Sequence, residues 1–584
     1  MRRLNVLLLG FVAFVVASLP RGAAADGLEA WMPDDIIGYV KVNDAGSRLE
    51  AFLKSDLRRE LEALEIVRRA RSEESWQKFE RQLAEFRSLT GKEPLQVFQE
   101  ILGKDVLVGV RLGFAGPEVI ALTRASSEER LKGTLDAIRQ GAEKRAGHPV
   151  RGIESTYSGR TIETFGPVSA TTLGEVLAVS NSSRALENVI DLAAGKALPS
   201  VKSSPTFQKA ASAVPAGSLA CLVARPMFVP NLFIPEKAEN VVGSLIGGGW
   251  LGALQASELI AVSLSAAGEE LRLSLATVLG ERAKDENYWK KFRSFFPDAG
   301  AGGEVGRRFE GRGILGMIQL RRDFSDWWAN GDSLLLPRGL DEMFQFSQGM
   351  SMIFGGRSFK DDVLSQLSPI MTIIARNQEY AGEKPHPSYP GFAAILEMKN
   401  PKETGDAFEA AFQTVAGFVN SDRTQKGKEP ISLKKETAGG VQMQVMSLPE
   451  KGEEAGVAEN VSPSLAVVGR HVIISSTRGL ARMLAEEAQK PAEGAGAPVA
   501  QDSLMVNAEA LRAILGDNLD LVVADNMRTK GHTKEQAEAE IKTVLDVLGI
   551  FKDLRVSSGK TGDTVELKLL LRVRGSTGAA PTKL

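Results

Sequence analysis

The chain of 584 residues has one cysteine, Cys221, and four histidines. A lone cysteine cannot form an intramolecular disulfide, and it also excludes a cysteine-rich zinc site. Four histidines leave little material for metal binding or acid–base chemistry. An excess of charge of one sign is missing too, because 71 basic and 73 acidic residues give a formal net charge of -2. That balance provides no basic surface for nucleic acid.

The rest of the composition is that of an ordinary globular protein. Hydrophobic residues make up 43% of the chain and charged residues 25%. These fractions exclude a disordered or collagen-like chain. At roughly 150 residues per domain, the length corresponds to about four domain-sized units.

The N-terminus predicts export. Arg2 and Arg3 precede an apolar run over residues 4–19, and Ala23-Ala24-Ala25 offers an A-x-A cleavage site. This is the pattern of a signal peptide, residues 1–25. An uncleaved anchor is the alternative, although a full bilayer span needs about 20 apolar residues. No cysteine follows the run, which excludes lipid anchoring there, and the arginine pair leaves the general and twin-arginine routes open. We expect a periplasmic or extracellular protein.

A second apolar stretch, residues 241–264, is interrupted by Gln255, Glu258 and three consecutive glycines. A membrane span needs a nearly continuous apolar stretch. We therefore expect a buried core segment here and no transmembrane span in the mature chain.

Self-similarity divides the mature chain into two copies. The strand-like run of residues 36–42 returns as residues 314–320. Further matches follow in the same order: helix starts at Ser126 and Asn400, turns at Gly159 and Gly439, strands over 176–180 and 472–476, helices at Arg184 and Arg478, strands from Ser218 and Ser503, and hairpins over 260–278 and 554–573. Because the matches keep one order along the chain, they indicate a tandem duplication.

The boundaries follow from these matches. Copy one covers residues 26–285 and copy two residues 309–574. Residues 286–308 predict a glycine-rich linker, and residues 575–584 a flexible tail.

Within each copy, strands alternate with helices, yet several strands are joined by short turns. This favours an α+β fold with antiparallel sheets packed by helices on one face over a doubly wound parallel sheet. A long charged helix is expected over residues 57–89.

Several motifs resemble cofactor or catalytic signatures, but their context argues against that chemistry. The G-x-G-x-x-G pattern of residues 311–316 precedes a predicted strand, whereas a dinucleotide site needs it at the start of a helix. Residues 558–561 resemble the end of a phosphate-binding loop but lie in a predicted hairpin. The S-x-x-K spacing at residues 432–435 and 557–560 falls in stretches that do not look helical.

The titratable residues form no recognisable site. The histidines, which are not at metal-ligand spacing, are His148, His386, His471 and His532. The pairs Asp34-Asp35 and Asp361-Asp362 predict caps of helices or turns. We therefore predict no catalytic, cofactor-binding or metal-binding residue. Sequons at Asn181 and Asn460 matter only in a eukaryotic secretory pathway.

Two features favour binding. Met343, Phe346, Met350 and Phe354 form a stripe at helical spacing, which predicts either a core face or the lining of a cavity. The second feature is the apolar, glycine-punctuated segment 226–254, where the second copy has a charged helix instead. That difference between the copies is where a specific function is expected.

Three short runs resemble a known family. They are Met32-Pro33-Asp34-Asp35-Ile36-Ile37-Gly38 after a signal peptide, Tyr157-Ser158-Gly159, and Ser204-Pro205-Thr206-Phe207. Together they are similar to the landmarks of exported bacterial proteins catalogued as domain of unknown function 3352. The resemblance implies a location in the cell envelope and supplies no activity, substrate or catalytic residue.

These observations predict an exported, non-enzymatic envelope protein that acts by binding or assembly, with an unknown envelope protein or an apolar ligand as its partner. A carrier of lipid or another apolar ligand and an envelope hydrolase with a dispersed site are the alternatives. A deep pocket of clustered titratable residues would favour the hydrolase. A dry cavity along the stripe of residues 343–354 would favour the carrier, and an exposed apolar patch near Trp250 would favour a protein partner.

Overall fold

A computed structural model describes residues 27–574 except 56–57, 60–61, 63–64, 114–115, 227–236, 268, 298–308, 310–312, 381–383, 450–459 and 491–501. The predicted signal peptide and tail lie outside the described residues. The chain divides into two compact units, one made of Met1–Leu232, Ser257–Gly280 and Arg572–Leu584, the other of Phe233–Ala256 and Glu281–Leu571.

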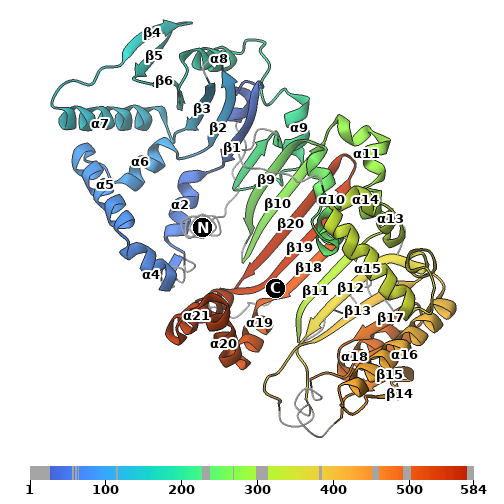
Figure 1. Ribbon diagram of the computed structural model, residues 1–584. Helices are drawn as coiled ribbons and strands as arrows, with labels where there is room; N and C mark the ends of the chain where they lie inside the picture. The colour runs from blue at the N-terminus through green and yellow to red at the C-terminus, as the bar shows by residue number, and fades with distance from the viewer. Residues whose placement is uncertain are drawn as a thin grey trace. The chain divides into compact units, whose positions relative to one another are not determined.

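The first unit is built on antiparallel strands rich in β-branched and aliphatic residues, the residue types that favour pleated, half-buried surfaces. They are β1 (Ile36–Val42), β2 (Val106–Gly113), β3 (Gly116–Arg124), β4 (Ile153–Tyr157), β5 (Arg160–Phe165), β6 (Val168–Leu173), β7 (Val176–Ser180), β8 (Ala220–Ala224), β9 (Ser257–Ala267) and β10 (Glu270–Leu279). Their order in space is β4-β5-β6-β7-β3-β2-β1-β8-β9-β10 (Figure 1).

The second unit has a matching set of strands. They are β11 (Ile314–Arg321), β12 (Leu367–Arg376), β13 (Gly391–Met398), β14 (Ser432–Ala438), β15 (Val441–Ser447), β16 (Ser464–Val468), β17 (His471–Ser475), β18 (Asp502–Asn507), β19 (Phe551–Thr561) and β20 (Thr564–Val573). Each strand pairing described in the first unit has an antiparallel counterpart in the second. The predicted α+β fold with antiparallel sheets is confirmed.

Even local irregularities repeat. The pairing of β1 with β2 shifts register between Ile36 and Gly38, and that of β11 with β12 shifts between Ile314 and Gly316. A side chain at Gly38 would place its Cβ 2.6 Å from the carbonyl oxygen of Val223. The glycine therefore permits the close approach of strands at the bulge.

The structure corrects the alignment of the copies by one residue in places. Val176 and His471 occupy the same register position, opposite Leu173 and Val468 respectively, whereas the sequence matches align Val176 with residue 472. A two-residue turn precedes each of these strands, Gly174-Glu175 in one unit and Gly469-Arg470 in the other, so strand pairing fixes the alignment here.

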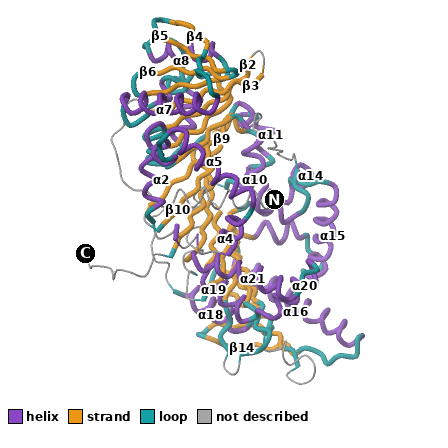
Figure 2. The backbone as a smooth tube through the Cα atoms, turned by 90° about the vertical axis from the view of Figure 1, so that its left-hand side faces the viewer, coloured by secondary structure: helices purple, strands orange, loops and turns teal. Residues whose placement is uncertain are grey.

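Helices of the first unit are η1 (Leu28–Ala30), α2 (Ala45–Leu53), α4 (Glu65–Ser72), α5 (Glu74–Thr90), α6 (Pro94–Ile101), α7 (Glu128–Ala146), α8 (Ser183–Ala193) and α9 (Pro205–Ser212). In both views α8 lies against the strands of its own unit (Figure 1, Figure 2), where it contacts β5, β6 and β7. The main core of this unit includes Ile120, Leu186, Phe207 and Val223.

Two helix predictions need correction. The helix expected over residues 57–89 is interrupted, because Glu73 has an extended backbone (ψ 145°) and separates α4 from α5. Arg71, at this break, pairs with Glu62 at 2.6 Å and lies over the Trp76 ring. Helix α7 is capped by Ser127, which accepts from the N–H of Arg130, and not by the predicted Ser126.

Helices of the second unit are α10 (Val241–Gln255), η3 (Glu281–Lys284), α11 (Glu286–Lys290), η4 (Arg293–Phe295), α13 (Phe324–Ala329), α14 (Gly331–Leu334), α15 (Pro337–Ile353), η5 (Phe359–Val363), η6 (Leu364–Gln366), α16 (Pro401–Gln425), α18 (Arg478–Gln489), α19 (Ala508–Asp517), α20 (Leu519–Lys530) and α21 (Lys534–Ile550). None of the helices in the described part of the chain is both long and apolar enough to cross a membrane. The cores of this unit lie under α18 and among α13, α15 and α16.

Helix α10 belongs to the second unit, although its sequence lies inside the first predicted copy. Its glycines explain this placement. A Cβ at Gly248 or Gly252 would lie 2.4 Å from the ring of Phe295 or Phe292, so only glycine lets these buried rings reach the helix backbone. The predicted burial of this segment is correct for the face of α10 that contacts residues 292–295, whereas Val242 and Ile246 on the same helix are 65% and 47% exposed.

A charged contact fixes the same helix. Arg322 is 1% exposed, and its guanidinium donates to the carbonyl oxygens of Leu245 and Ile246 on α10. The same group pairs with both oxygens of Asp502, at 2.6 and 3.0 Å. Since a buried charge is tolerated only when it is paired and hydrogen-bonded, the arginine, the aspartate and α10 form one interdependent contact.

The predicted linker is also shorter than residues 286–308. Its first part forms α11 and η4, where Phe292 and Phe295 are each 1% exposed. Burial of these aromatic rings against α10 makes this part a packed element. The remainder, residues 298–308, lies outside the described residues.

Candidate functional site

The four histidines lie on different elements of the structure. His148 is exposed, and His386 pairs with Asp520 at 2.9 Å on the surface. His532 lies 2.9 Å from the side-chain oxygen of Asn526, and His471 lies at the start of β17. Among the residues that the structure describes, no group of three or more His, Cys, Asp or Glu side chains could hold a metal ion.

The cofactor-like motifs have the context that the sequence predicts. Gly316 lies inside strand β11, so the G-x-G-x-x-G pattern does not open a helix. Residues 558–561 end strand β19 at a hairpin, and residues 432–435 begin strand β14. These segments therefore lack the helical geometry that a phosphate loop or a Ser–Lys pair requires.

The acidic pairs have structural roles. Asp361 and Asp362 both accept hydrogen bonds from Ser358, which begins the short helix η5. The predicted capping role is confirmed there. Asp35 instead pairs with an arginine from the neighbouring strand.

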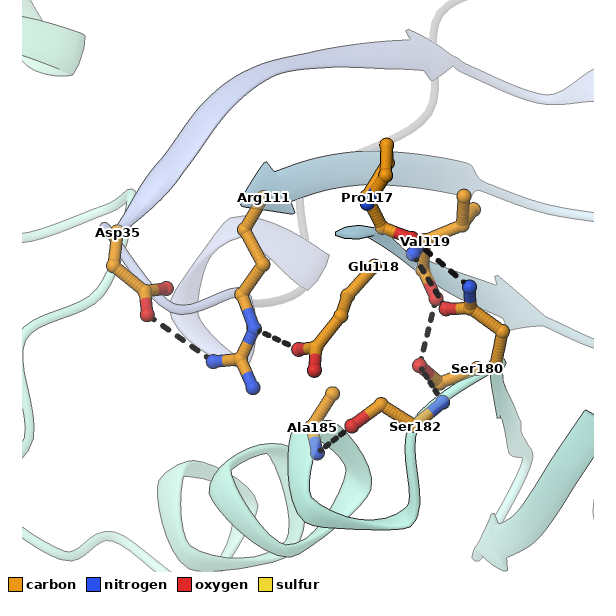
Figure 3. Close-up of polar contacts among 9 residues, drawn as sticks. Asp35, Arg111, Pro117, Glu118, Val119, Ser180, Ser182 and Ala185 are labelled. Atoms are coloured by element: carbon orange, nitrogen blue, oxygen red, sulfur yellow. Dashed lines mark hydrogen bonds and ion pairs between the residues drawn. The ribbon is translucent and has the colours of Figure 1, made fainter. Parts of the chain in front are cut away.

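That arginine, Arg111, is the centre of a polar cluster in the first unit (Figure 3). Its side chain is 9% exposed, and it pairs with Glu118 at 2.6 Å and with Asp35 at 3.1 Å. Glu118 stands directly opposite Arg111 in the β2–β3 register. Two carboxylates therefore neutralise one guanidinium and join the ends of β1, β2 and β3.

The second unit shows which part of this cluster belongs to the fold. Arg376 occupies the position of Arg111, opposite the start of β11, but Gly313 and Gly391 stand where the carboxylates do. Arg376 pairs with Glu379 instead, at 3.2 Å. The arginine is thus common to both units, and the two carboxylates are particular to the first.

The turn from β7 into α8 completes the cluster drawn in Figure 3. Asn181 accepts from the N–H of Val119 at 2.8 Å and donates to the carbonyl oxygen of Pro117 at 3.0 Å. Ser182 caps α8 by accepting from the N–H of Ala185. These bonds satisfy backbone groups at the sheet edge, so we interpret the cluster as structural.

The sequon asparagines are both engaged in such contacts. Asn460 is 2% exposed, accepts from the hydroxyl of Tyr380 and the N–H of Tyr389, and donates to the carbonyl oxygen of Pro387. These hydrogen bonds hold the loop between β12 and β13 in place. In the folded protein neither asparagine presents its amide as an unengaged group.

The methionine- and phenylalanine-rich helix α15 is the strongest candidate for a binding site. The predicted stripe divides in two: Met343 and Phe354 are each 6% exposed and lie in the core, whereas Phe346 is 51% exposed and lies beside Trp328 and Phe359. The stripe is therefore mainly a core face.

The adjoining side of α15 forms an open groove with α16. The groove has a volume of about 560 Å³ and is lined by Phe344, Ser347, Ser351 and Met352 of α15, by Gly355 after it, and by Phe418 of α16. Phe344 and Met352 are each 65% exposed, and Phe418 is 50% exposed. Sequence periodicity misses Phe344 and Phe418, because they lie outside the buried stripe.

Local sequence explains the shape of the groove. Ser347, Ser351 and Gly355 repeat every four residues, so small side chains form its floor. Helix α15 ends there because Gly355 and Gly356 have φ of 68° and 85°, the left-handed conformation that ends many helices. Residues 343–356 contain no charged side chain, so the apolar residues of the groove have no charged neighbour along this stretch of chain.

No family model and no curated protein matches the chain. Among solved structures, crystal forms I and IV of TP0453 are similar over 44% and 43% of this chain and over 81% and 80% of that chain. The sequence identity is 12% and 11%, and the TM-score is 0.23 in both cases. A TM-score this low does not establish a shared fold, so the resemblance to the family of unknown function stays a prediction.

Proposed function

We propose that the mature chain is an exported, non-enzymatic protein of the cell envelope that binds a partner protein in the groove between α15 and α16. Export is supported by the leader-like residues 1–25 and by the family resemblance of the mature N-terminus. The observation that carries the binding role is the uncharged stretch 343–356, which keeps Phe344 and Met352 largely exposed.

The chemistry of the groove selects an uncharged helix as its occupant. Small residues at every fourth position allow a helix backbone to approach closely, and flexible methionine and phenylalanine side chains adapt to apolar anchors. Helix-in-groove recognition uses this combination. A charged residue of a partner would lose its water in the groove and gain no counterion from residues 343–356.

The same geometry weighs against the two alternatives. A carrier needs a cavity that encloses most of its ligand, whereas Phe344, Met352 and Phe418 leave the groove open to solvent. A hydrolase needs a nucleophile, a base and an orienting group in mutual reach, whereas the histidines lie apart at the surface or at a strand start.

The test is site-specific photo-crosslinking of the full chain in its own host. A benzophenone side chain replaces Met352, and the control position is Asp341, which is exposed on the same helix outside the groove. We expect one discrete protein adduct from position 352 and none from position 341.

A second pair of variants tests whether the groove itself is recognised. Phe418→Asp places a charge in the groove and removes the adduct, whereas Gln413→Asp places the same charge at an exposed position of α16 outside it. Both side chains are exposed, so both variants keep the fold. A lipid adduct in place of a protein adduct, or an adduct unaffected by Phe418→Asp, would contradict the proposal.

A further inference from the structure

The strand β4 is an open edge of the first unit (Figure 1). In the described residues it pairs with β5 alone, and no other segment forms a backbone hydrogen bond with it. Ile153, its first residue, is 79% exposed, the highest value among the large hydrophobic side chains of the described part of the chain. An edge strand presents a row of N–H and C=O groups that can pair with another strand. The sheet can therefore be extended at β4.

The register of the β4–β5 hairpin shows which backbone groups face outward. Tyr157 and Arg160 pair directly across a two-residue turn, Ser158-Gly159, whose φ angles are 46° and 72°. The residues that flank such a turn form a hydrogen-bonded pair, and hydrogen-bonded and non-hydrogen-bonded pairs alternate along the strands. The N–H and C=O groups of Glu154 and Thr156 therefore point away from β5, toward the place of an added strand.

The equivalent edge of the second unit, strand β14, is protected against such pairing. In the described residues β14 pairs with β15 alone, and it carries Lys434 and Lys435. A second copy of β14 centred on either lysine would place that lysine opposite its own copy, where like charges repel. Edge lysines are a common device against edge-to-edge pairing. Strand β4, with the sequence Ile-Glu-Ser-Thr-Tyr, contains no lysine, arginine or proline.

We infer that β4 pairs with β4 of a second copy of this chain in an antiparallel, two-fold symmetric dimer. A register centred on Ser155 places Glu154 opposite Thr156 of the second copy, so the outward N–H and C=O groups of both strands meet. The same register places Ile153 opposite Tyr157 of the second copy, and pairs of β-branched and aromatic side chains stabilise neighbouring strands. No charged residue then lies directly opposite a like charge. Because both copies use the same strand, the contact closes after two chains.

The size of the contact sets its strength. Five residues of each copy form the pairing, whereas a standard interface has about 20–30 residues a side. We therefore expect a weak dimer that dissociates on dilution. The inference goes beyond the proposed function and does not depend on it, because the groove between α15 and α16 belongs to the other unit.

Engineered cysteines test the register. The two copies of Ser155 lie opposite each other as a non-hydrogen-bonded pair, with Cα atoms about 4.5 Å apart, which a disulfide can bridge. The two copies of Thr156 lie at diagonal positions, about 7–8 Å apart, which is too far. Both residues are exposed, and the native Cys221 is buried.

Under mild oxidation of the mature chain, we expect Ser155→Cys to form a disulfide-linked dimer at least tenfold faster than Thr156→Cys on a non-reducing gel. Equal rates for the two variants, or no dimer from Ser155→Cys, overturn the inference.

Sedimentation equilibrium over a range of concentrations measures the association itself. Ile153→Lys should weaken it at least tenfold, whereas Leu112→Lys, at a 60% exposed position of the interior strand β2, should leave it unchanged. Both side chains are exposed, so both variants keep the fold. Glu154→Gln should strengthen association severalfold, because the two Glu154 carboxylates lie diagonally across the axis and repel each other. A monomer at every concentration, equal effects of the two lysine variants, or weaker association in Glu154→Gln overturns the inference.

Discussion

The packing of α10 on the rings of the second unit makes a sharp prediction for two glycines of one helix. In Gly252→Ala the new methyl group would lie 2.4 Å from two ring carbons of Phe292, a side chain that is 1% exposed. In Gly247→Ala the new methyl group would meet nothing within 4 Å. The second substitution is therefore a matched control for the first.

The magnitudes follow from two opposing effects. Replacing glycine by alanine inside a helix stabilises it by about 0.8–1 kcal/mol, and this gain applies at both positions. Overpacking a buried ring costs about 1–3 kcal/mol, and this loss applies only at Gly252. We expect Gly247→Ala to raise the free energy of unfolding and Gly252→Ala to leave it unchanged or lower it, with a difference of about 1–3 kcal/mol between them.

Urea denaturation followed by tryptophan fluorescence measures this difference. Four of the six tryptophans, Trp250, Trp289, Trp327 and Trp328, belong to the second unit, so the signal reports mainly on that unit. Equal unfolding free energies for the two variants would refute the packing of α10 on Phe292.

Three further predictions concern the buried polar groups. Asp502→Ala leaves the guanidinium of Arg322 buried without its counterion, so we expect the free energy of unfolding to fall by about 3–5 kcal/mol in urea denaturation. In Arg322→Met it falls by less, because Asp502 is partly exposed and can be hydrated. Burial raises the pKa of the Cys221 thiol to about 11, so the folded protein favours the protonated thiol. The free energy of unfolding therefore falls by about 2–3 kcal/mol as the pH rises from 9 toward 11. Cys221→Ala removes that part of the pH dependence in denaturation curves. Asn460→Ala removes the acceptor of the Tyr380 hydroxyl and releases the loop between β12 and β13, so limited chymotrypsin digestion is expected to cut faster after Tyr380 in that variant. An unchanged cleavage rate would show that other contacts hold the loop.

Much of the fold could be predicted because strands and short turns leave local signals. The runs at residues 36–42 and 314–320 are strands, and both terminal hairpins, β9–β10 and β19–β20, form where the sequence indicates. The α+β class follows from these local patterns. The repeated strand order of the two units could be predicted because the apolar runs keep the same order along the chain.

What the sequence could not show depends on contacts between distant residues. In the sequence alone, the glycines of α10 look like an ordinary glycine-rich run. Their role follows only from the contact with Phe292 and Phe295 in the structure. For that reason the helix is assigned to the wrong part of the chain, and the residues that bind it are read as a linker. One-residue slips in the alignment arise in the same way, because strand pairing, not sequence spacing, decides which residues face each other.

The candidate site was predicted only in part. Periodicity identifies the stripe that contains Met343 and Phe354, but those side chains are core. The residues that line the groove, Phe344 and Phe418, belong to different helices, and neither follows the buried period. A readable signal exists all the same: fourteen consecutive residues, 343–356, carry no charge in a chain that is 25% charged.

The most direct test of the binding role is native mass spectrometry of the mature chain, purified gently from the envelope fraction of its own host. We predict a complex whose mass exceeds that of the chain by one protein. Phe418→Asp should remove this added mass, and Gln413→Asp should keep it. A bare chain, or a chain that carries only a lipid-sized mass, would contradict binding of a partner protein in the groove.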